Sequence, residues 1–178
     1  IKEDLIEIKA SDYSGILYAF ESLHQLILIS ENEKNKLPII SIEDSPRFKY
    51  RGFLLDASRN FYGIDKVKQV IDYMAHFKLN KLDFRLTDDE GWRLEIPGLP
   101  ELTEIGSKRG FTKDESDKLI PMYGSGAFSN NSGSGYYTRE EFVEILKYAK
   151  RRNIDVFPQI SFPSHARAAI KSMEVRYK

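Results

Sequence analysis

The pattern of apolar and polar positions divides the chain into a short first part and a longer second part. In the first part, residues 3–9 have the composition of a short strand. From about Ser14, apolar side chains recur at steps of three and four residues, which predicts a helix with one apolar face. A polar break at residues 31–36 and a short apolar segment at residues 37–42 follow. We expect this first part to comprise residues 1–45.

The second part, residues 46–178, changes regularly between two periodicities. Short apolar or alternating runs predict three strands, at residues 52–57, 80–87 and 154–160. Helical spacing of apolar side chains predicts three helices, at residues 64–78, from residue 139, and from residue 166 to about residue 175. Strands that alternate with helices imply parallel strands joined by right-handed crossovers, so we expect an α/β fold.

A long irregular stretch separates the second predicted strand from the helix predicted at residue 139. Residues 96–137 show no regular period, and their centre, residues 124–135, is rich in Gly and Ser and flexible by composition. Loops of this length inside compact domains are usually functional or disordered. The stretch ends where Thr138 and Glu141 have the spacing of a capping box, which marks the start of the helix at residue 139.

The length of the chain limits which architecture it completes. A closed eight-stranded (β/α)8 barrel takes about 250 residues, and only three barrel-type strands are predicted here. We therefore expect part of a barrel, either a fragment of a longer protein or one half completed by another chain. The first residue is Ile1 rather than Met, as expected for a chain that is processed, trimmed or cut from something longer.

Composition narrows the choice of partners. Lys plus Arg and Asp plus Glu both total 27, so nothing favours nucleic acid or an anionic membrane. No apolar run approaches the roughly 18 residues that a membrane span needs. The sequence has no cysteine, which excludes disulfides and thiolate metal sites.

Polar side chains follow all three predicted strands. The first strand continues into Ser58-Arg59-Asn60, the second into residues 88–93, and the third into residues 161–165, which end in His165. Because the carboxyl ends of parallel strands share one edge of the sheet, we expect these groups to lie near one another. The sequence thus predicts a site at this edge.

Each group also has a purely structural interpretation. Arg59 could be a surface arginine, Asp88-Asp89-Glu90 a solvated loop or a helix N-terminus, and His165 a helix cap. Trp92 is more often a core residue than a sugar platform. The sequence contains no phosphate-binding glycine loop, no Gly-x-Ser-x-Gly elbow and no His-Glu-x-x-His helix. The other two histidines, His24 and His76, fall within predicted helices and are expected to be structural or exposed.

Three segments resemble glycoside hydrolase family 20, the β-N-acetylhexosaminidases. YRGFLLDASR at residues 50–59 resembles the first barrel strand of that family. LTDDEGWRLEI at residues 86–96, followed by PELT, resembles its second-strand motif. YTREE at residues 137–141 and PQISFPSH at residues 158–165 resemble its third. Residues 1–43 resemble the end of the small α/β domain that precedes the barrel, so the expected fold is α/β, a partial (β/α)8 TIM barrel behind the end of an accessory domain.

The resemblance implies removal of terminal β-linked N-acetylglucosamine or N-acetylgalactosamine from glycans, with retention of configuration. In that mechanism the 2-acetamido group of the sugar is the nucleophile, an Asp polarises it, and the adjacent Glu is general acid and then base. By motif position, Arg59 would bind the sugar hydroxyls, and Asp88 would bond His165, which supports the catalytic Glu. No metal and no organic cofactor are expected. A periplasmic, cell-surface or secreted location is what the family suggests.

The sequence lacks one part of the family's machinery and departs from it in others. The catalytic Asp-Glu pair belongs to the fourth barrel strand, which would lie beyond Lys178. Asp114-Glu115, within the irregular stretch, does not replace it. Four motif positions are retained, namely Arg59, Asp88, Trp92 and His165. Six positions depart from the pattern, namely Asn60, Asp83, Arg85, Gln159, Ser161 and Ser164.

Three hypotheses remain open at this point. The first is a hexosaminidase fragment that is inactive alone, and the second is a degenerate relative that binds amino sugars, or nothing, without turnover. The third is an unrelated α/β scaffold. An open half-barrel would also expose an unpaired strand edge and apolar surface, so we expect the isolated chain to self-associate.

Overall fold

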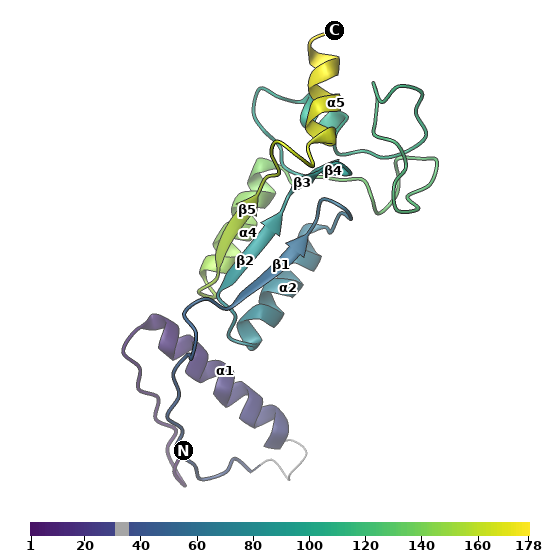
Figure 1. Cartoon of the computed structure of the whole chain (residues 1–178). Coiled ribbons are helices and arrows are strands. Elements are labelled where there is room, and N and C mark those ends of the chain that lie inside the picture. The colour runs from purple at the N-terminus through teal and green to yellow at the C-terminus, as the bar shows by residue number, and fades with distance from the viewer. Residues whose placement is uncertain (31–35) are drawn as a thin grey trace.

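A three-stranded parallel sheet forms the centre of the computed structural model, which describes residues 1–30 and 36–178 (Figure 1). The strands are β1 (Gly52–Asp56), β2 (Lys81–Arg85) and β5 (Asp155–Gln159), in the order β1-β2-β5. Lys81 of β2 is level with Gly52 on one side and with Asp155 on the other, so the three strands start and end together. The predicted parallel α/β fold is therefore confirmed.

Two helices cover one face of this sheet. α2 (Ile64–His76) and α4 (Arg139–Lys150) pack against each other and against the side chains that β2 turns towards them. The resulting core consists of fully or almost fully buried side chains, among them Val67, Ile71, Leu82, Phe84 and Ile145. The capping box at the start of α4 is confirmed, since the Glu141 amide donates to Thr138 Oγ1 over 3.1 Å and the Thr138 amide donates to Glu141 Oε2 over 2.9 Å.

The opposite face of the sheet is uncovered. Leu54 and Phe157 are exposed on this face, where both are level with Asp83, and β1 and β5 pair with no further strand among the described residues. In a closed barrel this face would be turned towards the interior, and both outer strands would have neighbours. The arrangement is what part of a barrel presents.

The strand predicted at residues 80–87 is divided in the structure. After β2 the chain forms a small antiparallel pair from β3 (Thr87–Asp88) and β4 (Gly91–Trp92). The turn back is fixed by Leu86, whose amide donates to the Gln159 carbonyl and whose carbonyl accepts from the Arg93 amide. This small hairpin carries Asp88 beyond the carboxyl edge of the sheet.

Two buried arginines hold the irregular stretch that precedes α4. Apart from the one-turn helix α3 (Glu101–Glu104), residues 96–137 contain no helix. Arg93 is fully buried and donates five hydrogen bonds, all to backbone carbonyls, namely those of Ala57, Ser58, Ser107, Gly133 and Gly135. Burial lowers the pKa of Arg93 to about 9, with a further contribution from Arg109, and the group still stays charged at neutral pH. The Gly- and Ser-rich centre is thus tied to the end of β1, which its composition alone does not reveal.

Close packing around these arginines explains two glycines of the region. A Cβ on Gly133 would lie 2.2 Å from a terminal nitrogen of Arg109, which donates to the Arg59 carbonyl. A Cβ on Gly91 would lie 2.3 Å from a terminal nitrogen of Arg93. Real Cβ atoms do not approach this closely, so any larger residue would displace the guanidinium that holds the loop.

The first part of the chain contains the predicted helix and lacks the predicted strand. α1 (Tyr13–Ser30) lies beyond the amino ends of the strands (Figure 1). The strand predicted at residues 3–9 is wrong, because the segment forms no ladder with any described residue, and the two hydrogen bonds between Ile1 and Ile40 lie outside it. The polar break predicted at residues 31–36 lies, except for residue 36, outside the described residues. No helix of the described residues is long and apolar enough to cross a bilayer.

A candidate active site at the carboxyl edge of the sheet

The three residues predicted to form a site lie together. Arg59 follows β1, Asp88 belongs to β3, and His165 precedes α5 (Arg167–Arg176). A terminal nitrogen of Arg59 lies 3.4 Å from Asp88 Oδ2, and His165 Nδ1 lies 3.1 Å from Asp88 Oδ1. The carboxylate therefore stands between a guanidinium and an imidazole that come from different strand ends.

Asp88 is almost fully buried, with 1% of its side chain exposed. Its Oδ1 accepts the amide of Asp89 over 2.7 Å, and its Oδ2 also forms an ion pair with Arg85. Arg85 lies on the uncovered face of the sheet. Alternation along the sequence does not predict which of the two faces this residue occupies. A buried carboxylate needs such compensation, because an isolated charge removed from water costs several kcal/mol.

Arg59 in turn is surrounded by carboxylates. Burial by itself lowers the pKa of the Arg59 guanidinium, but Asp88, Asp56 and Glu90 together outweigh burial and raise it. Asp56 lies 3.3 Å from the guanidinium, and Glu90 lies 3.9 Å from its Nε. Arg59 is therefore held as a fixed cation with 40% of its side chain exposed, open to a ligand.

Glu90 connects this cluster to the irregular stretch. The Tyr123 hydroxyl donates to Glu90 Oε1 over 2.9 Å, and this hydrogen bond raises the pKa of the phenol. Tyr123 itself is largely exposed, at 71%. The exposed aromatic ring thus stands at the margin of the charged cluster.

Several buried polar atoms at this edge lack a hydrogen bond within the described chain. Five buried side-chain atoms of the described residues have no hydrogen-bond partner, and four of them belong to Arg59, Arg85, Asp88 and Glu90. The Asp88 oxygen concerned makes ion pairs, but no hydrogen bond. Because buried polar groups are normally paired, their concentration here marks a place where a polar ligand would complete the pairing.

The next acidic residue, Asp89, fastens the edge to α5. Asp89 Oδ1 accepts the amide of Arg167, the first residue of α5, over 3.0 Å. Arg167 also forms an ion pair with the buried Glu115. The helix N-terminus interpretation therefore applies to Asp89, and Asp114-Glu115 is a structural link between the irregular stretch and α5.

The backbone at His165 is unusual. Its φ is +56°, a left-handed conformation that side chains other than glycine adopt rarely. Such conformations persist where the surroundings over-determine them, and they concentrate at functional sites. With 51% of its side chain exposed, His165 reaches Asp88 on one side while the rest of the ring faces outward.

The cluster also contains atoms of the kinds that bind metal ions. One ligand atom each from Asp88, Asp89 and His165 lies within 4.8 Å of the other two. The guanidiniums of Arg59 and Arg85 already neutralise Asp88, however, and they would repel a divalent cation. The electrostatics of this edge therefore favour an uncharged polar ligand over a metal ion.

The residues that depart from the family pattern differ in the hydrogen bonds that they make. Asp83, in the middle of β2, accepts the Tyr50 hydroxyl over 2.9 Å and forms no hydrogen bond or ion pair with the cluster. Ser161 joins β5 to β3, through its amide to Thr87 Oγ1 and its hydroxyl to the Thr87 carbonyl. Asn60, Gln159 and Ser164 make no side-chain hydrogen bond to another described residue.

Some residues of the edge escape prediction from sequence. Trp92 is half-buried and donates its indole N–H to the Leu94 carbonyl over 2.5 Å, as expected for a packing residue. Glu90 stands in the second-strand motif and could have been singled out there. Tyr123 carries no signal at all, because it lies 33 positions further along in a segment without periodicity.

Fold and site together define the class of protein. A parallel sheet with helices on its outer face, and a polar site where the strands end, is the layout of a (β/α)8-barrel protein. The model of glycosyl hydrolase family 20, catalytic domain, matches residues 48–178. The chain therefore belongs to glycosyl hydrolase family 20.

Relatives of known name agree with this membership. An N,N'-diacetylchitobiase of Vibrio harveyi is 53% identical over 99% of this chain, and a β-hexosaminidase of Vibrio vulnificus is 47% identical over 97%. A crystal structure of a family 20 exo-β-N-acetylglucosaminidase from Vibrio harveyi, in complex with N-acetylglucosamine, matches 98% of this chain with a TM-score of 0.83 and 39% identity. The chain spans 20% of the length of both relatives and 26% of that crystallised chain.

Proposed function

We propose that the protein carrying this chain is a β-N-acetylhexosaminidase, which hydrolyses terminal β-linked N-acetylglucosamine or N-acetylgalactosamine. The observation that carries the proposal is the edge cluster, in which Arg59, Asp88 and His165 meet among buried polar atoms that lack hydrogen bonds. A sugar is an uncharged ligand with many hydroxyls, and it would supply those hydrogen bonds without adding charge. The names of the relatives agree with this substrate class.

In this proposal the chain contributes residues of two domains. Residues 1–45 end an accessory α/β domain, and residues 46–178 begin the catalytic barrel. The change from α1, whose apolar residues Phe20 and Ile27 stay exposed, to a sheet with a buried core supports this division.

Arg59 binds the sugar hydroxyls in the proposed complex. Its guanidinium is oriented by Asp56 and Asp88, and 40% of the side chain remains exposed. A planar donor held in this way presents a fork that matches vicinal hydroxyl oxygens.

Asp88 and His165 act together as positioning residues. His165 Nδ1 lies 3.1 Å from Asp88 Oδ1, so the Nδ1 side of the ring faces Asp88 and Nε2 faces away from it. The second ring nitrogen is then available to a carboxylate of the following strand. In the substrate-assisted mechanism of the family, that carboxylate is the Glu that protonates the leaving oxygen and later activates water.

The nucleophile in this mechanism belongs to the substrate. The acetamido oxygen attacks the anomeric carbon while the glycosidic bond breaks, and water then opens the cyclic intermediate with overall retention. The Asp that polarises the acetamide and the acid–base Glu come from the fourth barrel strand, so the activity belongs to the longer protein and not to these 178 residues alone.

The test is an assay of the protein that includes the fourth strand, on a chromogenic N-acetylglucosaminide and its galacto epimer. We expect hydrolysis, and the anomer formed first, read by proton NMR, should be the β-anomer. The ion pair between Arg85 and Asp88 favours a second candidate, an amino-sugar-binding relative without turnover, because a cation stands where the family commonly has His. Sugar binding without hydrolysis would support that candidate and overturn the enzyme.

We also propose that the isolated chain self-associates through the uncovered face and edges of its sheet. Leu54 and Phe157 are exposed on that face, and unpaired strand edges invite pairing with a second copy. Light scattering should give a mass above the 20.6 kDa of one chain. A stable monomer at that mass would contradict the proposal.

A further inference from the structure

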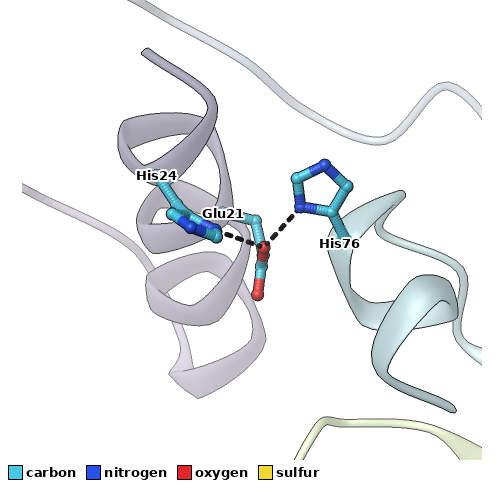
Figure 2. Close-up of side chains that lie close together, drawn as sticks. All are labelled: Glu21, His24 and His76. Atoms are coloured by element: carbon cyan, nitrogen blue, oxygen red, sulfur yellow. Dashed lines mark ion pairs between the residues drawn. The ribbon is translucent and has the colours of Figure 1, made fainter. Parts of the chain in front are cut away.

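A second histidine–carboxylate cluster lies at the opposite end of the sheet. Figure 2 shows Glu21 and His24 on α1 facing His76, the last residue of α2. Glu21 Oε2 lies 3.4 Å from His76 Nδ1 and 3.9 Å from His24 Nδ1, so both imidazoles converge on one carboxylate oxygen. The two rings stand edge to face, 5.7 Å apart. Two of the three histidines of the sequence are thus collected here.

The spacing of these donors is close to that of a metal centre. The ligand atoms of the three residues lie within 4.8 Å of one another. Tetrahedral zinc, with ligand bonds of about 2.1 Å, places its ligands about 3.4 Å apart. The distance from His76 Nδ1 to Glu21 Oε2 already equals this value, at 3.4 Å. The distance from His24 Nδ1 to Glu21 Oε2 is 3.9 Å, half an ångström longer. A small rotation of exposed side chains would close the difference.

The surroundings of this cluster leave room for a cation. Among the described residues, no Lys or Arg forms an ion pair with Glu21. The nearby Lys78 is engaged elsewhere, because its ammonium lies 3.0 Å from Asp44 and donates to Ser22 Oγ over 2.6 Å. No charge among these contacts competes with a metal for the Glu21 carboxylate.

Neighbouring contacts hold the two helices in the geometry that the cluster needs. Gln25, one turn after Glu21, donates its amide to the His76 carbonyl over 2.9 Å. The His76 ring also packs edge to face on Phe77, at 5.1 Å between centroids. Because the two helices are held in this way, zinc binding requires only rotation of side chains and no movement of the backbone.

We propose that Glu21, His24 and His76 bind a zinc ion that joins α1 to α2. Two imidazole nitrogens and one carboxylate oxygen suit zinc, whereas calcium and magnesium prefer oxygen ligands alone. With three protein ligands, the fourth position takes water. The ion links the first part of the chain to the barrel, far from the edge that carries Arg59 and Asp88, and has no part in hydrolysis.

The test is a calorimetric titration of the chain with zinc chloride, with magnesium chloride and calcium chloride in parallel. We expect one zinc per chain, a higher melting temperature with zinc, and no binding of the other two ions. His24→Gln and His76→Gln should each raise the dissociation constant for zinc about 100-fold or more, since loss of even an outer partner of a ligand costs about 10- to 100-fold. Circular dichroism of each variant shows whether it keeps its fold.

The third histidine provides the matched control. His165→Gln should leave zinc affinity and stoichiometry unchanged, because His165 belongs to the cluster at the other end of the sheet. X-ray absorption of the zinc-loaded wild-type chain should show two imidazoles and light-atom ligands on the metal. Absence of zinc binding, binding that His165→Gln abolishes, or fewer than two imidazoles on the metal would each overturn the proposal.

Discussion

The two ends of the sheet carry similar side chains in different electrostatic surroundings. At the carboxyl end, Asp88 and His165 lie beside two guanidiniums. At the amino end, Glu21 is paired only with His24 and His76 among the described residues. The kinds of side chain present therefore do not by themselves determine which ligand a site binds. Positive charge already present favours an uncharged polar ligand at one end, and its absence favours a cation at the other.

The largest effect is expected when the carboxylate at the centre of the carboxyl-end cluster is neutralised. Asp88→Asn in the complete protein keeps the shape of the side chain, but it removes the negative charge that lies beside the Arg59 and Arg85 guanidiniums and the His165 ring. We expect kcat/KM on a chromogenic N-acetylglucosaminide to fall by about 10²- to 10⁴-fold. Asp155→Asn, at the exposed amino end of β5, is the control and should change little. Near-normal activity of Asp88→Asn would remove Asp88 from the site.

The second effect concerns the buried arginine that supports only the carboxyl end. Arg93→Met leaves five backbone carbonyls without their donor, so the free energy of unfolding should fall by at least about 3 kcal/mol. Urea denaturation measures the loss, and the exposed Arg139→Met should stay within about 0.5 kcal/mol of wild type. An equal, small loss in both variants would mean that the carbonyls find other partners.

A third change should allow the carboxyl end of the sheet to bind zinc, as we propose for the amino end. Arg59→Gln combined with Arg85→Gln removes the cations beside Asp88, while Asp88, Asp89 and His165 keep donor atoms within 4.8 Å of one another. Calorimetry should then detect one additional zinc per chain, bound at least about tenfold more weakly than at a site with two imidazoles. Lys81→Gln, at the amino end of β2, removes a positive charge away from Asp88 and should add no site. An unchanged stoichiometry in the double variant would show that charge is not what separates the two ends.

The smallest effect is expected at the margin of the carboxyl-end cluster. Tyr123→Phe removes the hydrogen bond to Glu90 and keeps the ring, so kcat/KM should fall by about tenfold or less, the worth of one such bond. Tyr136→Phe is a control in the same stretch, since the Tyr136 hydroxyl makes no hydrogen bond to a described residue. Losses of equal size in the two variants would deny Glu90 and Tyr123 a role in the site.

Much of the fold follows from periodicity along the sequence. The strands at residues 52–57 and 154–160 were predictable from their short apolar runs, and the helix from residue 139 was predictable from the capping box at its start. The strand predicted at residues 3–9 fails for a physical reason. A strand forms only with a partner, and local composition carries no information about whether a partner is present.

The candidate site also contains some residues that could be predicted from the sequence and others that could not. Arg59, Asp88 and His165 could be brought together from sequence, since the ends of parallel strands share an edge. The place of Arg85 could not, because alternation does not say which face points to the helices. The meeting of Glu21 with His76 was also beyond prediction, because it depends on how α1 packs against α2 and not on any local pattern.

The most direct test of the account follows the imidazole NMR signals of the complete protein, assigned by His24→Gln, His76→Gln and His165→Gln. We expect N-acetylglucosamine to shift the His165 signals and to leave those of His24 and His76 in place. Shifts confined to His24 and His76, or no shift of His165 at saturating sugar, would contradict the claim that the carboxyl edge is the sugar site.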